Sequence, residues 1–247
     1  LCAGGAGQLD ANAVESYRKG LLAFEEGDAD NTRRAISWFR RAVEENPYYF
    51  RAWRSLGLAY HRLEYYRLAR PALERALEQQ ADHVEANLAY AETMLLLGNA
   101  PVARRHIDRV LNQLPRNTRA LFVDALWWSK NGRLDLAFDR LRSVLAIAPQ
   151  YWQAHLLRGQ LLAASGQTYA AELAFRAAVT ATPHGARARY GLGRFLFDQG
   201  RLAEAGRELK TTVELDREFV PALEPLARIL FIGGDYPGAA DIFARLT

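Results

Sequence analysis

Apolar residues recur every three to four positions in successive stretches of about 13 residues, and short polar segments separate these stretches. In one of them, Trp53, Leu56 and Tyr60 fall on the same side of a helix, and Gly57 lies beside Leu56. This spacing predicts an amphipathic helix whose apolar side packs against neighbouring helices. Because the same spacing returns in weaker form along nearly the whole chain, an all-α protein is expected.

Proline, glycine and alanine each recur at multiples of 34 residues. Proline disfavours helix at the residue before it and so closes a helix, and glycine accepts the left-handed conformation in which a tight hairpin turns. Alanine is small enough to let two helices approach closely where they cross. The prolines are Pro47, Pro115, Pro149 and Pro183; the glycines are Gly98, Gly132, Gly166 and Gly200; the alanines are Ala35, Ala69, Ala103, Ala137, Ala171, Ala205 and Ala239.

Together the three patterns predict seven helical hairpins. Since one hairpin cannot cover its own apolar side, stacking of the hairpins must supply the core. The first helices are expected near residues 14–26, 51–63, 85–97, 119–131, 153–165, 187–199 and 221–233. The second helices are expected near residues 32–45, 67–79, 101–113, 135–147, 168–181, 202–215 and 236–246.

The second hairpin carries a specific resemblance to a known family. Its pattern is similar to the tetratricopeptide repeat in the residues Trp53, Leu56, Gly57, Tyr60, Ala69, Leu73 and Ala76. The resemblance covers about residues 13–247 and implies an all-α, right-handed superhelical solenoid of about seven hairpins, with a long concave channel. The repeats are expected near 13–49, 50–83, 84–117, 118–151, 152–185, 186–219 and 220–247, after an N-terminal tail at 1–12.

Two departures from the repeat pattern are local. The first repeat has three extra residues between Gly27 and Ala35, which predicts a longer loop inside the first hairpin. Ala81 and Arg217 stand where prolines are expected, and their turns are predicted to be softer.

Composition and charge exclude several classes of protein. The net charge of +4 comes from 32 basic and 28 acidic residues spread along the chain, without the basic block of a nucleic-acid-binding arm. No apolar run reaches the roughly 18 residues of a membrane-spanning helix. A single cysteine, Cys2, cannot form an internal disulfide or build a structural zinc site.

The N-terminal stretch LCAGGAGQ combines an apolar start with small residues, as at the end of a signal peptide and its cleavage site. This favours export to the periplasm, with a cytoplasmic location as the alternative. A flexible tail without targeting value explains the composition equally well. A lipid anchor at Cys2 ranks lower, because Leu1 stands where a small residue is normally found.

No catalytic, cofactor or metal site is indicated. The five histidines show no metal-ligand spacing, and adjacent carboxylates on a helix point away from each other. His61 and His155 lie on first helices and are expected to reach the channel, but as catalysts they lack an evident nucleophile. Only a pocket with either histidine within hydrogen-bond distance of a carboxylate and a hydroxyl would favour an enzyme.

The resemblance implies that a partner binds to the first helices, at positions that are not used for stacking. Apolar residues in the middle of this channel would form a patch, and arginines at both ends suit acidic side chains or a terminal carboxylate. The alternative is that tight curvature of the array buries the patch. The candidate partner-binding residues are Arg51, Arg54, Leu88, Arg119, Phe122, Leu126, Leu156, Leu157, Arg187, Tyr190 and Arg194.

We therefore expect a non-catalytic scaffold that binds a peptide or helical segment of a protein partner, within a bacterial envelope assembly. The alternative is a docking or spacer region of a larger enzyme or of a secretion or transport machine. Phe243 and Leu246 lie near the end of the last expected helix without a polar capping helix after them, which predicts self-association or a further domain. An adaptor for acidic chaperone tails is disfavoured, because Tyr17, Leu21 and Ser55 replace its lysine and asparagines.

Overall fold

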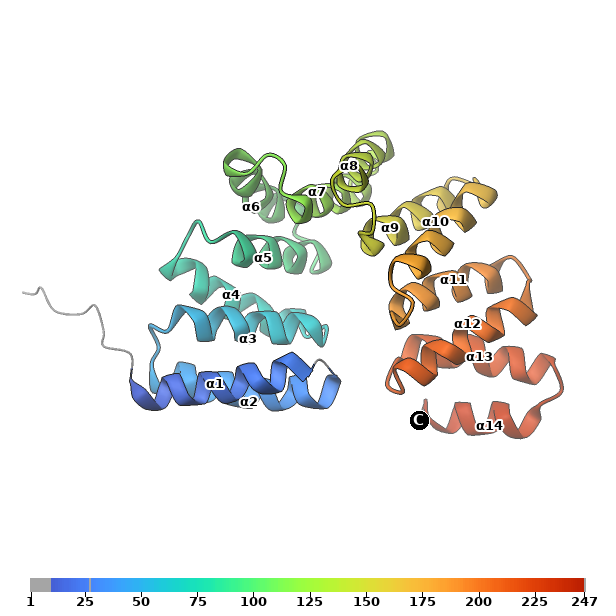
Figure 1. The fold of residues 1–247 in the computed structure, drawn as a ribbon, viewed down its shortest axis with the longest axis horizontal. Coiled ribbons are helices and arrows are strands. Elements are labelled where there is room, and N and C mark those ends of the chain that lie inside the picture. Colours follow the sequence, from blue (N-terminus) through green and yellow to red (C-terminus); the bar gives the residue numbers. More distant parts are fainter. Residues whose placement is uncertain (1–9, 27, 247) are drawn as a thin grey trace, which may run out of the picture. The chain divides into compact units, whose positions relative to one another are not determined.

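The computed structural model describes residues 10–26 and 28–246, and within these ranges the chain forms fourteen α-helices and no strand (Figure 1). The predicted helices agree with the observed ones to within three residues at each end. The first helices of the hairpins are α1 (Ala11–Glu26), α3 (Phe50–Arg62), α5 (Val84–Leu96), α7 (Thr118–Lys130), α9 (Trp152–Ala164), α11 (Ala186–Asp198) and α13 (Val220–Ile232). The second helices are α2 (Ala29–Glu45), α4 (Tyr66–Gln79), α6 (Ala100–Gln113), α8 (Leu134–Ile147), α10 (Thr168–Ala181), α12 (Leu202–Leu215) and α14 (Tyr236–Ala244).

The helices form two compact units, of which the first ends at Asn131 and the second begins at Gly132. In the first unit, α1 to α7 pack in chain order, and the first helix α5 also contacts the first helices α3 and α7. In the second unit, α8 to α14 pack in the same way, with contacts between α9, α11 and α13. Each unit is thus an all-α repeat solenoid in which the first helices share one face, which we call the first-helix face.

The periodic alanines and glycines have the roles that their spacing predicts. The seven alanines are buried, six of them completely. Gly98, Gly132, Gly166, Gly200 and also Gly234 have φ angles between 73° and 83°, a conformation that L side chains rarely adopt. In the second hairpin, Glu64 occupies this position with a φ of 63°, and Tyr65 then makes the same backbone hydrogen bond that Asn99 makes after Gly98.

The turns between hairpins are fixed by one recurring hydrogen bond. A side chain six residues after the proline position donates to the carbonyl oxygen there, from Trp53 to Pro47, from His155 to Pro149 and from Arg189 to Pro183, at 2.8–2.9 Å. At Ala81, where we expected a softer turn, Asn87 donates to the carbonyls of both Ala81 and His83. Side-chain hydrogen bonds therefore hold this turn without proline.

The predicted longer loop in the first hairpin is wrong, because the extra residues lengthen α2 at its start instead. α2 has 17 residues, against 14 in most of the other second helices. Asp28 caps α2 by accepting a hydrogen bond from the backbone N–H of Asn31 at 2.7 Å. This cap satisfies an amide that has no partner inside the helix and lets α2 begin early.

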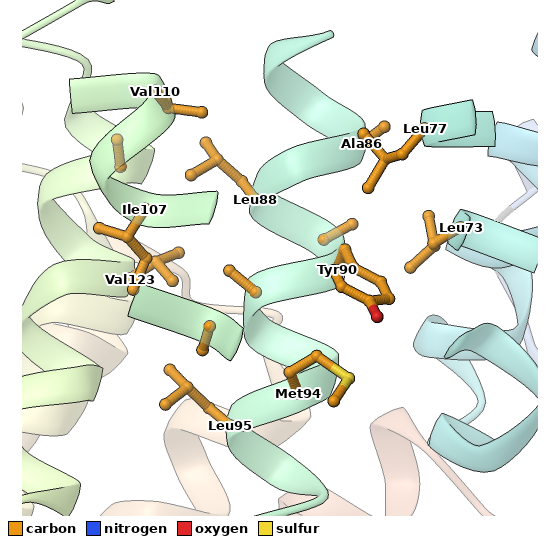
Figure 2. Close-up of a cluster of buried hydrophobic side chains, with 14 of the residues drawn as sticks. Leu73, Leu77, Ala86, Leu88, Tyr90, Met94, Leu95, Ile107, Val110 and Val123 are labelled. Atoms are coloured by element: carbon orange, nitrogen blue, oxygen red, sulfur yellow. The ribbon is translucent and has the colours of Figure 1, made fainter. Parts of the chain in front are cut away.

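The core of the first unit surrounds α5, in which nine of 13 residues are buried. Figure 2 shows Leu88 on α5 directed toward Ile107 and Val110 of α6, while Ala86 and Tyr90 face Leu73 and Leu77 of α4. Close approach elsewhere depends on glycine: a Cβ at Gly57 would lie 2.5 Å from Cγ of Leu73. The predicted scaffold roles of Leu56, Gly57 and Leu73 follow from these contacts.

Among the described helices, none is long and apolar enough to cross a membrane.

Candidate partner-binding surfaces

Six of the predicted partner-binding residues lie on first helices of the first unit, and five of them have some exposed surface. Arg51 is exposed, and Arg54, Arg119, Phe122 and Leu126 are half-buried. The sixth, Leu88, is only 1% exposed and packs in the core, so it offers no surface to a partner.

A row of charged side chains links the first helices of this unit. Arg54 Nη1 on α3 lies 3.4 Å from Glu85 Oε2 on α5, and Arg119 Nη2 on α7 lies 3.0 Å from Glu92 Oε2 on α5. His61 Nε2 on α3 is 3.4 Å from the same Glu92 oxygen. The arginines predicted to receive a partner's carboxylates are thus already close to carboxylates of the chain, except Arg51, which has no hydrogen-bond or ion-pair partner among the described residues.

His61 meets in part the condition that would favour an enzyme, since it lies near a carboxylate and a hydroxyl. Its Nδ1 is 3.0 Å from Thr93 Oγ1. However, Thr93 is 0% exposed, and its hydroxyl donates to the carbonyl of Ala89 at 2.8 Å. A substrate cannot reach this hydroxyl, and the contact fastens α3 to α5. His155 donates to the carbonyl of Pro149 and so fixes a turn rather than facing a substrate.

Buried polar side chains also connect the second helices of the first unit to α5. His106 on α6 lies 2.7 Å from Asn87 Oδ1, and burial lowers the pKa of His106 to about 4. Tyr90 donates to Glu74 Oε1 at 2.6 Å, and burial, reinforced by this hydrogen bond, raises the pKa of Tyr90 to about 12. These groups stay neutral near pH 7 and support the packing of α4, α5 and α6.

In the second unit the predicted residues divide between exposed and buried positions. Arg187 and Arg194 are exposed, and Arg194 lies within 3.3 Å of both carboxylate oxygens of Asp198. Tyr190 packs on Phe219 with ring centroids 5.1 Å apart. Leu157 is 7% exposed, and Leu156 packs so closely on the backbone of α11 that a Cβ at Gly191 would lie 2.3 Å from it.

The predicted apolar patch falls on both units. Phe122 and Leu126 belong to the first unit, and Leu156, Leu157 and Tyr190 belong to the second. The first group is half-buried, and both groups pack partly against the cores of their own units.

The second unit also contains two grooves that the sequence analysis missed because it considered only the first helices. The larger has a volume of about 700 Å³ and lies between α12, α13 and α14, beside Lys210, Val213 and Leu226. The smaller, which we call the Arg158 groove, has a volume of about 550 Å³. It is lined by Phe138, Arg142, Leu145 and Ala146 of α8, Arg158 and Leu162 of α9, and Gln167 before α10.

The two grooves occupy the same place in the repeat, since Arg142, Leu145 and Arg158 each lie 68 residues before a residue of the other groove. The sequence contained an indication of the Arg158 groove, because Arg158 falls at a repeat position that holds leucine in three other repeats. Within the described residues, no group of three or more histidine, cysteine, aspartate or glutamate side chains is placed to hold a metal ion.

Family models match three segments of the chain. Two models, both described as tetratricopeptide repeat, match residues 64–121 and residues 129–186 and 156–218. Together these segments cover more than half of the chain.

Solved structures with the same fold include several tetratricopeptide repeat and pilus proteins. TTC0263, a tetratricopeptide repeat protein of Thermus thermophilus, is 23% identical with a TM-score of 0.68 over 74% of this chain and 99% of its own. PilW, a type IV pilus biogenesis factor, is 19% identical with a TM-score of 0.65 over 90% of this chain and 99% of its own. The pilF protein of Pseudomonas aeruginosa is 18% identical with a TM-score of 0.59 over 80% of this chain and 90% of its own. At these identities the likeness concerns the fold.

Proposed function

The chain belongs to the tetratricopeptide repeat family, and from this membership we propose that it is a non-catalytic scaffold that holds a segment of a protein partner on its first-helix face. The observation that carries the proposal is the surface of the first unit, where α3, α5 and α7 lie next to one another. Half-buried Phe122 and Leu126 supply apolar area there, and exposed Arg51 supplies an unpaired cation.

The charges of this face define the partner's chemistry. Because Arg54 and Arg119 are near Glu85 and Glu92, a partner's carboxylate would have to displace an existing pair. Arg51 has no such competitor, so we assign it the first contact with an acidic group. The partner segment therefore combines an acidic end with an apolar middle.

Two single variants on the first-helix face test the proposal, each with a matched control on α4 of the same unit. Arg51→Glu and Phe122→Asp are compared with Arg67→Glu and Leu68→Asp, because Arg67 and Leu68 are exposed on the second helix. The chain is used to recover partners from an extract of its own source organism. We expect one protein to be recovered with the native chain and both controls, and about tenfold less of it with the two face variants.

Folding of all four variants is checked by circular dichroism and thermal melting. Arg51→Glu is the stricter variant, since its side chain is exposed and its replacement disturbs no packing. Equal recovery with Arg51→Glu and Arg67→Glu, both folded, would exclude the first-helix face as the binding surface.

We also propose placement in a bacterial envelope assembly. Two proteins of similar fold, PilW and pilF, support this placement, and the composition of the N-terminal stretch, which lies outside the described residues, favours export. Fractionation of cells of the source organism, with an antibody against the chain, tests it. Detection in the cytoplasmic fraction alone would contradict envelope placement and leave the scaffold proposal intact.

A docking region of a larger machine is the second candidate, and the last hairpin favours it. Phe231, Ile232 and Tyr236 are each about 60% exposed, and Phe243 is 41% exposed. An apolar surface of this kind commonly marks a contact with another domain or copy. Light scattering distinguishes a second copy of the chain from another domain. A dimer that forms with rising concentration and that Phe231→Ser abolishes indicates self-association. A mass that stays that of a monomer at every concentration indicates a different partner domain.

A further inference from the structure

Arg158 breaks a pattern that every other comparable repeat keeps. The residues at the same repeat position on other first helices are all buried between their own second helix and the preceding one. They are Leu56, Tyr90, Asp124, Leu192 and Leu226, and none is more than 6% exposed. Arg158 is exposed at the same position of α9. An arginine thus replaces a core residue, and the Arg158 groove opens beside it.

The charges around this groove are unbalanced. Arg158 has no hydrogen-bond or ion-pair partner in residues 10–26 and 28–246. Arg142 pairs with Asp139 on its own helix at 3.1 Å, but both side chains are more than half exposed, so this pair is weak. Among the described residues that line the groove, none is acidic. Two guanidinium groups therefore face a cavity that contains no carboxylate of the chain.

The floor of the groove is apolar. Phe138, Leu145 and Leu162 line it, and Leu162 is 7% exposed. A volume of about 550 Å³ lies within the range of sites that hold small ligands or a few side chains. The groove can thus accept one large apolar side chain together with the carboxylates next to it.

Two exposed apolar residues lie on α10, the helix that begins directly after Gln167 of the groove. Tyr169 and Leu173 are 77% and 53% exposed and lie one helical turn apart, and Tyr169 follows two residues after Gln167 of the groove. The other second helices from α4 onward carry proline, alanine or a charged residue at both positions. Aromatic residues are enriched at the contact surfaces of protein partners.

We propose that the Arg158 groove is a second protein-binding site, which takes an acidic segment of a partner with one large apolar side chain. The apolar side chain lies on Phe138, Leu145 and Leu162, and flanking carboxylates pair with Arg142 and Arg158. This site is distinct from the first-helix face, because Arg158 points about 200° around α9 from Leu156. One scaffold thereby contacts two segments at once.

The probe is a panel of short amidated peptides labelled with fluorescein, each with leucine, isoleucine, phenylalanine or tryptophan between glutamates. Each peptide has a twin in which glutamine replaces glutamate. Fluorescence anisotropy with the whole chain should show at least one acidic peptide that binds about tenfold more tightly than its twin. A panel in which no acidic peptide binds better than its glutamine twin would overturn the proposal.

Arg158→Leu restores the residue found at this position in three other repeats, so it removes the charge without threatening the fold. Arg142→Gln removes the other cation and leaves the floor intact. Both should weaken peptide binding about tenfold, while Arg207→Gln, a surface arginine on α12, should not. Retained binding by folded Arg158→Leu and Arg142→Gln would refute the assignment.

The first-helix variants separate this site from the proposed function. Arg51→Glu and Phe122→Asp should leave binding of the acidic peptide unchanged. If they abolish it while Arg158→Leu does not, the peptide binds the first-helix face and the groove assignment fails, while the proposed function stands. A dimer that Arg158→Leu dissociates, without any peptide binding, would overturn the peptide site and instead give the groove to a second copy of the chain.

Discussion

Asp124 and Arg158 occupy the same position in successive repeats, and they show two outcomes of placing a charge in a repeat core. Asp124 in the first unit is 0% exposed, and Arg104 of the preceding second helix donates to it at 2.5 Å. Arg158 in the second unit lines a groove together with Phe138 and Arg142 of its preceding helix and remains exposed. A charge at this position is therefore buried where the neighbouring helix supplies the opposite charge, and it stays exposed where the neighbouring helix does not.

Breaking the pair in the first unit should have the largest effect. Arg104→Met leaves the Asp124 carboxylate buried without its cation and is expected to lower the free energy of unfolding by about 3 kcal/mol. The measurement is urea unfolding followed by circular dichroism. Arg105→Met on the exposed side of α6 is the control and should change stability by less than about 0.5 kcal/mol.

The double variant Arg104→Met, Asp124→Leu sharpens this test. Since both charges are gone, stability should return to within about 1 kcal/mol of the native chain. A single variant as stable as the native chain would show that the carboxylate is not buried as a charge.

Removing the unpaired charge in the second unit should have the opposite effect on stability. Arg158→Leu is expected to raise the free energy of unfolding by about 1–2 kcal/mol, because a leucine side chain is removed from water. The reverse change, Leu192→Arg, places an unpaired cation at a site that is 2% exposed and should destabilise the same unit. Thermal melting of Arg158→Leu and Leu192→Arg tests both expectations. A loss of stability in Arg158→Leu would contradict the view that the arginine takes the place of a core leucine.

Acid should weaken the first unit through His106. The pKa of His106 falls from 6.5 in the unfolded chain to about 4 in the fold, so the unfolded chain binds more protons between these values. Stability is complete above about pH 6.5 and falls as the pH drops toward 4, by about 1–2 kcal/mol once solvent screening is included. The difference in stability between pH 7 and about pH 4.5 should shrink in His106→Gln, and an unchanged difference would assign the acid sensitivity to other groups.

The smallest effect is expected at Glu64, the only described non-glycine residue with a positive φ. Glu64→Gly should stabilise the chain by up to about 1 kcal/mol, because glycine adopts this conformation without steric cost. Gly98→Ala, at the same place in the next hairpin, has free space for its Cβ and should destabilise by a similar amount through backbone strain alone. Equal stability of Gly98→Ala and the native chain would contradict the equivalence of the two turns.

Much of the fold followed from sequence, because its determinants are local and repeated. The glycine at the turn of each of the last five hairpins and the buried alanine that follows it have the same role in repeat after repeat. The loop prediction for the first hairpin was wrong because Asp28 caps α2 and so sets where this helix begins. The number of extra residues alone does not reveal that hydrogen bond.

The candidate site was harder to predict. Leu88 belongs to α5, which is apolar on almost every side, so its spacing could not reveal which side remains exposed. The ion pairs of Glu85 with Arg54 and of Glu92 with Arg119 join residues about 30 positions apart on different helices. Such pairs depend on how far each helix is rotated about its axis, which the repeat period leaves open.

The sequence by itself determined the helices, their turns, the period of the repeat and the family, because each depends on a residue's conformational preference or size at a fixed spacing. Only the tertiary structure decided which charges are paired, which leucines are covered and where a groove remains. Those outcomes depend on the side chains that a neighbouring helix brings to the same place. Arg158 stays exposed in a groove that Phe138 and Arg142 also line, whereas Asp124 is buried beside Arg104.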